Sequence, residues 1–218
     1  MRMTTPLART ISLDIETKNL DMREEGLSFG NPEGWEVACI GVYIRTGAYE
    51  DRMAFAANPA IINRDALPTQ IAVQPLTALV RQLWRWLDDG YTLIAHNGDG
   101  FDIPILSKPV VLGGADCESV FNAYQVNYID TCASLLKLTG RRHHLQNLIK
   151  GTLGEDESKL MPAADAPREW SRNNFHKVID YCIADCEYTY KIYEYGKEYG
   201  YVDYMETDGK ITRIEVDW

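Results

Sequence analysis

Two acidic residues stand two positions apart near the end of a short apolar segment, Thr10 to Thr17. The β-branched and apolar residues of this segment predict a strand. Because side chains alternate between the faces of a strand, Asp14 and Glu16 share one face, and Leu13 and Ile15 share the other. Carboxylates held side by side repel each other, and a proton or a cation relieves the repulsion. Such a pair suits Mg²⁺ or Mn²⁺, although an edge strand with a solvated acidic face has the same pattern.

A third acidic residue, Asp102, follows the glycine-rich break Asn97-Gly98-Asp99-Gly100 between an apolar strand and a helix. A turn of this composition lets the backbone approach a ligand closely. The alternative is that Asp102 only stabilises the N-terminus of its own helix, where a negative charge is favourable. Asp99 is close enough in sequence to be a second candidate for the same role.

A fourth acidic residue, Asp185, lies four positions after Tyr181 on a long predicted helix. Residues at this spacing share one face of a helix. That face is offset from the apolar stripe of the helix, and it also carries Tyr188. A partly exposed polar edge of a surface helix is the alternative interpretation of this pair.

Three motifs then follow one another along the chain: Asp14-x-Glu16, Asn97-x-x-x-Phe101-Asp102 and Tyr181-x-x-x-Asp185. In this order they resemble the motifs of the DEDD superfamily of 3′–5′ exonucleases, and most closely the proofreading exonuclease domain of family B DNA polymerases. The resemblance covers about residues 13–195. Asp180 stands where the histidine subclass has its histidine, so the chain resembles the tyrosine subclass.

The resemblance implies a ribonuclease H-like fold and a site for two divalent cations, Mg²⁺ or Mn²⁺. Asp14 would bridge the two ions, Glu16 and Asp185 would complete one site, and Asp102 would hold the second ion. Tyr181 would orient the attacking water, because an unperturbed tyrosine is a poor base near neutral pH. The substrate contacts implied are those of Glu16 and Thr17 with the terminal 3′-OH, and of Asn97 and Phe101 with the terminal nucleotides.

The implied activity is metal-dependent hydrolysis of single-stranded DNA from its 3′ end to nucleoside monophosphates, in proofreading or repair. Two metal ions would stabilise charge on the attacking and the leaving oxygen. A polymerase or another replication protein is the expected partner. Two alternatives are retained: an exoribonuclease that trims RNA 3′ ends, and a noncatalytic nuclease-like module that binds nucleic acid.

Composition agrees with a single exonuclease domain over residues 1–218. The chain is 45% hydrophobic and 25% charged, and no apolar run is long enough to span a membrane. Its five cysteines form no CxxC pair and indicate reduced core thiols in a cytoplasmic protein. The formal net charge of −10 argues against tight, extended binding to duplex nucleic acid and favours a compact site for a strand end.

The remaining pattern predicts an α/β fold with a central mixed five-stranded sheet flanked by helices. We expect the sheet to begin antiparallel and to continue parallel, with the site where strand ends converge. The expected strands are 10–17, 35–44, 49–56, 91–96 and 126–130, and the expected helices are 76–87, 101–106, 131–138, 144–149 and 171–199. The expected loops are 18–33, 58–75, 113–114 and 155–168, and the tail after residue 201 is expected to hold one short strand near 211–216.

Two further features have open interpretations. The basic cluster Arg141-Arg142-His143-His144 either contacts the nucleic-acid backbone or is a solvated helix start. Its histidines are poor candidates for metal ligands. Asp130 ends a strand and could orient a ligand, but the cap of the following helix is the preferred interpretation.

Overall fold

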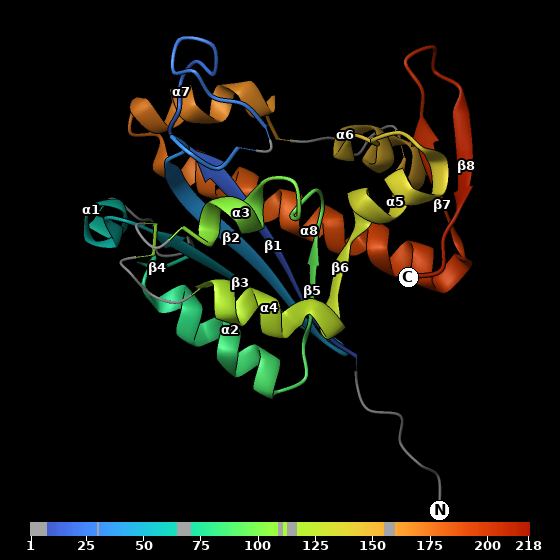
Figure 1. Cartoon of the computed structure of the whole chain (residues 1–218), viewed down its shortest axis with the longest axis horizontal. Coiled ribbons are helices and arrows are strands. Elements are labelled where there is room, and N and C mark those ends of the chain that lie inside the picture. Colours follow the sequence, from blue (N-terminus) through green and yellow to red (C-terminus); the bar gives the residue numbers. More distant parts are fainter. Residues whose placement is uncertain (1–7, 30, 65–70, 109–110, 113–116, 155–159) are drawn as a thin grey trace, which may run out of the picture.

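The computed structural model describes residues 8–29, 31–64, 71–108, 111–112, 117–154 and 160–218. It is an α/β structure built on one mixed sheet, with helices on both faces and a small hairpin at one end (Figure 1). The strands are β1 (Arg9–Thr17), β2 (Val37–Thr46), β3 (Tyr49–Ala56), β4 (Val73–Pro75), β5 (Thr92–Ala95), β6 (Tyr128–Asp130), β7 (Tyr201–Met205) and β8 (Ile211–Glu215). The helices are α1 (Pro59–Arg64), α2 (Ala78–Asp88), α3 (Asp102–Leu106), α4 (Cys117–Tyr124), α5 (Thr131–Thr139), α6 (Leu145–Leu148), α7 (Ala166–Ser171) and α8 (Phe175–Tyr199).

The central sheet has six strands in the order β4-β3-β2-β1-β5-β6, one more than expected. β1, β2 and β3 pair antiparallel, β5 and β6 continue parallel to β1, and β4 adds parallel to β3. The predicted change from antiparallel to parallel pairing is therefore confirmed. The additional strand is β4, which has only three residues and lies inside the segment 58–75, which was wrongly expected to be a loop.

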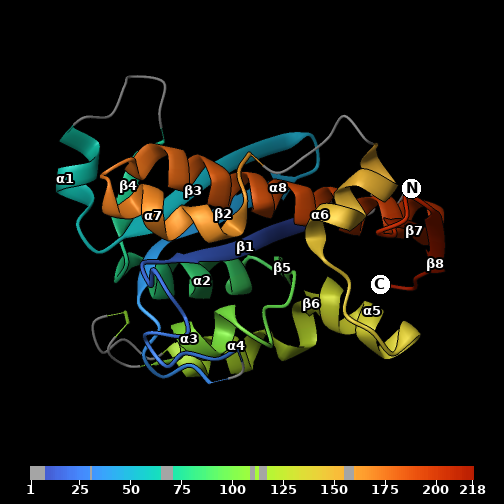
Figure 2. The same ribbon diagram turned by 90° about the horizontal axis from the view of Figure 1, so that it is seen from above.

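Two helical layers cover the sheet, one on each face (Figure 2). Helices α2, α3 and α4 bury one face, and the apolar residues Ile11, Leu13 and Ile15 of β1 lie in that core. Helices α7 and α8 cover the other face, and α8 packs directly on β1 and β2. The alternation of β1 therefore directs Asp14 and Glu16 towards α8, as the strand pattern predicted.

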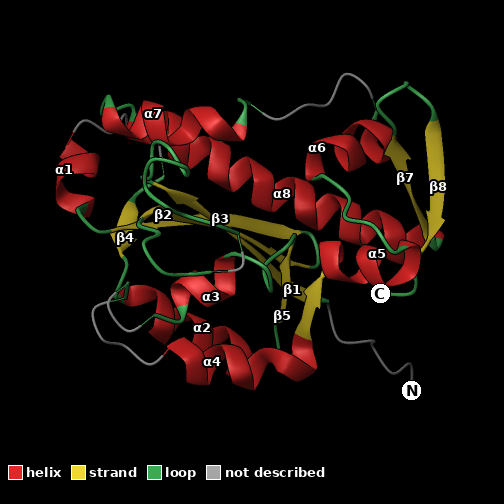
Figure 3. Cartoon of the chain, turned by 45° about the horizontal axis from the view of Figure 1, so that its top comes forward, coloured by secondary structure: helices red, strands yellow, loops and turns green. Residues whose placement is uncertain are grey.

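A third core lies beyond the end of the sheet, between the C-terminal hairpin β7–β8, helices α5 and α6, and the end of α8 (Figure 3). A π-helical turn, Ile149–Leu153, continues α6 and lies against β7. The sequence predicted one strand in this tail. The structure pairs two, from Tyr201↔Glu215 to Met205↔Ile211.

Three other expectations about secondary structure need correction. Helix α4 was missed, and helix α1 lies in the segment expected to be a loop. The long helix begins at Phe175 and not at residue 171, because α7 is a separate helix that ends at Ser171. The expected Gly113-Gly114 loop lies outside the described residues.

The five cysteines are all free and buried, as predicted. Within the described part of the chain, no helix has the length and apolar character needed to cross a membrane.

Candidate active site

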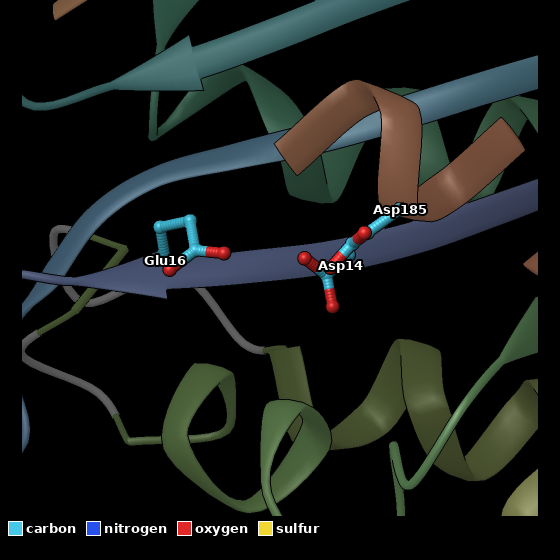
Figure 4. Close-up of side chains that lie close together, drawn as sticks. All are labelled: Asp14, Glu16 and Asp185. Carbon is cyan, nitrogen blue, oxygen red and sulfur yellow. The ribbon is translucent and has the colours of Figure 1, made fainter. Parts of the chain in front are cut away.

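Three carboxylates from two elements meet between the sheet and α8. Asp14 and Glu16 project from β1, and Asp185 reaches Asp14 from the middle of α8 (Figure 4). One carboxylate oxygen of each residue lies within 4.8 Å of the others. Among the described residues, this is the one group of three acidic, histidine or cysteine side chains close enough to share an ion. The strand and the helix predicted from separate motifs are thus brought into one site.

The close approach of α8 to the sheet depends on Gly41, which pairs with Asp14 across β1 and β2. A Cβ atom at Gly41 would lie 3.0 Å from the backbone and the Sγ atom of Cys182. The absence of that atom lets the helix pack against the strand. The Cys182 thiol lies 3.3 Å from the carbonyl oxygen of Asp14 and 3.6 Å from its Oδ2, close enough for weak S–H hydrogen bonds.

The fourth acidic residue, Asp102, lies beside β1 at the edge that faces β5. Its Oδ1 accepts a hydrogen bond from the backbone N–H of Ile15 at 3.0 Å. β5 pairs with β1 only over residues 10–12, so Asp102 satisfies a β1 donor that the sheet leaves open. The Asp102 carboxylate therefore contributes to structure as well as to the charge of the site, and it contacts both the strand and the backbone at the start of its own helix.

Burial sets the protonation of these acids. It raises the pKa of Asp102 to about 8, while the hydrogen bond from Ile15 acts in the opposite direction. Burial also raises the pKa of Asp14 well above its ordinary value, and the neighbouring carboxylates Asp102, Asp185 and Glu16 raise it further. A group of buried oxygen ligands that resists ionisation is stabilised by a divalent cation. The donor set therefore fits a hard metal ion.

Tyr181 is fully buried one helical turn before Asp185. Burial raises the pKa of its phenol far above the ordinary value, and the charges of Asp185, Glu16 and Asp14 raise it further. The hydroxyl group therefore keeps its proton beside the carboxylates and can act as a hydrogen-bond donor. This arrangement differs from the partly exposed helix edge that was the alternative for this pair.

The turn after β5 is held by Asp130, whose carboxylate accepts three backbone hydrogen bonds. They come from Asn97 at 2.9 Å, Asp99 at 3.0 Å and Ala133 at 3.0 Å. The last of these confirms the preferred interpretation of Asp130 as a helix cap. The other two show that it also fixes the turn in which Asn97 adopts a left-handed backbone conformation, with φ of 70°. Asp99 is exposed and lies outside the carboxylate group.

An aromatic group lies at the start of α3. The ring of Phe101 packs edge-on against Trp35 at 4.9 Å between centroids and lies 5.5 Å from Phe29. Phe29 is 64% exposed although it is a large apolar residue. Its exposure in the segment 18–33 is a feature that the sequence interpretation did not single out. Thr17, by contrast, is buried at the end of β1, after a register shift at Glu16/Thr17.

The basic cluster divides into residues with different environments. Arg141 is held by a salt bridge to Glu206, and His143 is buried against the ring of Tyr204 at 4.7 Å between centroids. Arg142 is exposed and donates to Oδ1 of Asn97 at 2.7 Å. Neither histidine belongs to the carboxylate group. His176, outside this cluster, is half-buried with its Nε2 3.1 Å from the carbonyl oxygen of Ile62.

Sequence reasoning missed Gly41 and Cys182, and left Arg142 undecided. A glycine inside a strand of branched apolar residues was an available signal, because it often marks a close backbone approach. Cys182 and Arg142 had no such signal, because their contacts join segments that are far apart in the sequence.

The sequence matches a family model described as 3′–5′ exonuclease over residues 4–195. No curated protein matches it significantly. Similar solved structures include exonuclease I (10% identity, TM-score 0.45) and E. coli exonuclease I in complex with a 5cy-dT13 oligonucleotide (10% identity, TM-score 0.44). In both comparisons 88% of this chain is covered, and the chain spans 41% of the exonuclease I chain.

Proposed function

The chain belongs to the 3′–5′ exonuclease family, and on that premise we propose that it hydrolyses single-stranded DNA from the 3′ end and releases nucleoside monophosphates. The observation that carries the proposal is the meeting of Asp14, Glu16 and Asp185, within 4.8 Å, beside the buried Tyr181. Glu16 and Asp185 are buried and Asp14 is half-buried, and a structural role alone gives no reason to bring such mutually repelling carboxylates together.

In this proposal the acidic residues hold two divalent cations, Mg²⁺ or Mn²⁺. Asp14, Glu16 and Asp185 would hold one ion, and Asp14 and Asp102 would hold the other. When bound, the cations supply a nucleophile near neutral pH and stabilise charge on the leaving oxygen. The chain itself contributes the spacing of the ligands, which the pairing of β1 with β2 and the packing of α8 keep fixed.

Tyr181 orients the attacking water through its hydroxyl group. The raised pKa of this phenol supports a role as hydrogen-bond donor and opposes a role as general base. Together with Asp180 in place of a histidine, Tyr181 supports membership of the tyrosine subclass and a likeness in function to the proofreading domain of family B polymerases.

A single-stranded substrate is proposed because of the aromatic group beside Asp102, and the resemblance to proofreading domains favours DNA. An exposed Phe29, in contact with Phe101, offers a ring face on which a base can stack without regard to sequence. Asn97 and Phe101 would then contact the terminal nucleotides. Thr17 and Glu16 would contact the 3′-OH near the end of β1. A duplex gains less from such a surface, and the net charge of −10 disfavours extended backbone binding.

The direct test uses a single-stranded DNA oligonucleotide labelled at its 5′ end, incubated with the protein and Mn²⁺, Mg²⁺ or EDTA. We expect a ladder that shortens from the 3′ end with either metal and full-length substrate with EDTA. RNA of the same sequence, run in parallel, tests the alternative of RNA trimming. Intact DNA and RNA in both metals would favour a noncatalytic binding module. The variant Asp14→Asn controls for a contaminating nuclease.

The remaining expectations are proposals of the same kind. We treat residues 1–218 as a single exonuclease domain, in which the hairpin β7–β8 adds to the part matched by the family. A role in proofreading or repair, and a polymerase or replication partner, stay predictions.

A further inference from the structure

Two neighbouring arginines, Arg141 and Arg142, have contrasting environments in the loop between α5 and α6. Arg141 donates to both carboxylate oxygens of Glu206, and the distance from its Nη1 to Oε2 is 3.0 Å. Its guanidinium lies 5.4 Å from the ring centroid of Tyr204. Both partners belong to the β7–β8 region. The charge of Arg141 is therefore neutralised, and its position is tied to the C-terminal hairpin.

Arg142 has no such partner among the described residues, where no carboxylate lies within salt-bridge distance of it. Its Nη1 donates to the side-chain oxygen of Asn97 at 2.7 Å, its Nη2 would lie 3.4 Å from a Cβ atom at Gly100, and the residue is exposed. A guanidinium group has five donors in a planar fork that suits a phosphate group. One of them fixes the direction of Arg142, and the others are open to an anion.

The contact with Asn97 places Arg142 beside the turn that leads to Asp102, and we call this loop the rim of the carboxylate site. Asn97 begins the turn that ends at Asp102, so the two Cα atoms are at most about 18 Å apart. The turn is fixed by Asp130, and His96 Nε2 lies 2.9 Å from the carbonyl oxygen of His143 in the basic loop. Two independent contacts thus attach the loop of Arg142 to the turn after β5.

The hairpin also holds α6 and the π-helical turn, which directly follow this loop (Figure 3). Asn147 Nδ2 donates to the carbonyl oxygen of Met205 at 2.7 Å, and Thr152 Oγ1 donates to that of Asp203 at 2.8 Å. A Cβ atom at Gly151 would lie 2.3 Å from the carbonyl oxygen of Asp203, so this contact requires glycine. The hairpin lies beyond residue 195, where the family match ends.

A positively charged side chain at this rim would offset a repulsion between the protein and its substrate. The chain carries a net charge of −10, and its site is a cluster of carboxylates, both of which repel the phosphates of a strand. Cations bound at the site would attract the scissile phosphate. The phosphates that follow it towards the 5′ end need a positive group farther from the carboxylates.

We propose that Arg142 binds a phosphate on the 5′ side of the scissile bond, and that the hairpin β7–β8 positions this arginine through the Arg141–Glu206 pair. The proposal rests on the exonuclease function and adds to it a contact that depends on substrate length. Arg142 is a binding residue in this account, and Arg141 and Glu206 are positioning residues.

The first experiment compares the dinucleotide TpT, whose one phosphate is the scissile phosphate, with a ten-residue thymidine oligonucleotide. For Arg142→Gln we expect KM for the decamer to rise about tenfold with little change in kcat, and kcat/KM for TpT to stay as in the wild type. The slope of log(kcat/KM) against log[salt] for the decamer should become shallower by about 0.7. Arg142→Lys should restore part of the affinity, because it keeps the charge but loses the fork.

Arg81→Gln is the matched control, since Arg81 is an exposed arginine on α2, in the helical layer on the face of the sheet opposite α8. It removes the same charge and should leave KM for both substrates unchanged. An equal loss for TpT and the decamer in Arg142→Gln, or an equal effect of Arg81→Gln, would overturn the role of Arg142 as a specific phosphate contact.

The second experiment tests the hairpin with Glu206→Gln. We expect a smaller rise of KM for the decamer, about threefold, with kcat and the TpT reaction unchanged. In the double variant with Arg142→Gln the Glu206 substitution should have no further effect, because the group it positions is gone. Additive effects of the two substitutions would overturn the positioning role of the hairpin.

Binding of a fluorescein-labelled thymidine decamer in EDTA separates the two proposals. A wild-type protein that binds the decamer but cleaves neither substrate contradicts the exonuclease proposal alone. Weaker binding by Arg142→Gln would still support the phosphate contact in that case, and unchanged binding would overturn it.

Discussion

The carboxylate site and the basic rim beside it are built in different ways. The site is carried by β1 and α8, its acids are mostly buried, and all of it lies inside the part of the chain that matches the exonuclease family. The rim is carried by the loop of Arg141 and Arg142 and by a hairpin outside that match, and the Arg141–Glu206 side chains are 49% and 22% exposed.

The difference indicates which property each region controls. Buried ligands on packed elements hold fixed distances, which a phosphodiester hydrolase needs for its reaction step. Partly exposed ion pairs contribute only about 0–1 kcal/mol each to stability. Changes at the rim should therefore alter substrate affinity, and changes in the site should alter turnover. The predictions below test this division, beginning with the largest expected effect.

Replacement of a shared ligand should have the largest effect. Asp14→Asn and Asp185→Asn should each lower kcat on the order of a thousandfold or more, because either change removes a cation ligand and its charge. The melting temperature in EDTA should stay the same or rise, since one repelling carboxylate is lost. Both are measured by oligonucleotide cleavage and thermal unfolding. Asp88→Asn, at an exposed position on α2, is the control. Substantial turnover by either ligand variant would contradict the site assignment.

Loss of the buried phenol should have an intermediate effect. Tyr181→Phe keeps the packing and removes one hydroxyl group, so we expect kcat to fall by about tenfold to a hundredfold and KM to change little. The measurement is steady-state cleavage of the decamer. A loss as large as that of Asp14→Asn would mean that the tyrosine does more than orient water.

A smaller effect should follow from pushing the helix away from the strand. In Gly41→Ala the new methyl group would meet the backbone of Cys182 at 3.0 Å, which should lower the free energy of unfolding by about 1–3 kcal/mol. We expect kcat to fall severalfold and KM to stay similar, because Asp185 moves relative to Asp14. Denaturant unfolding and cleavage kinetics measure the two effects. An alanine variant with wild-type kcat would show that the site tolerates a shift of α8.

A pH dependence of stability in EDTA is expected in addition to these effects on catalysis. The pKa of Asp102 is about 8 in the folded protein against an ordinary value of 3.8. Its protonated form therefore stabilises the fold below about pH 4, and this contribution is lost as the pH rises through 8. The asparagine in Asp102→Asn cannot ionise. The melting temperature of this variant minus that of the wild type should therefore increase between pH 5 and pH 9. A constant difference across this range would contradict the raised pKa, and saturating Mg²⁺ should reduce the dependence.

Much of the fold followed from local pattern. β1, β3, α2 and α5 were predicted close to their observed bounds, because their apolar periodicity and flanking glycines or turns are strong signals. Helix α4 was missed although Cys117, Val120, Phe121 and Tyr124 have helical spacing and are buried. β4 has three residues, too few for a periodic signal, and only its pairing with β3 makes it a strand.

The types and order of Asp14, Glu16, Asp102, Tyr181 and Asp185 were determined by the sequence, because periodicity places each of them on a face of its own element. The meeting of Asp14, Glu16 and Asp185 within 4.8 Å was decided by the tertiary structure, since it requires α8 to cross β1 where Gly41 leaves room. The different contacts of Arg141 and Arg142 were also decided by the tertiary structure. The two side chains are chemically identical and adjacent, and only the folded positions of Glu206 and Asn97 distinguish them.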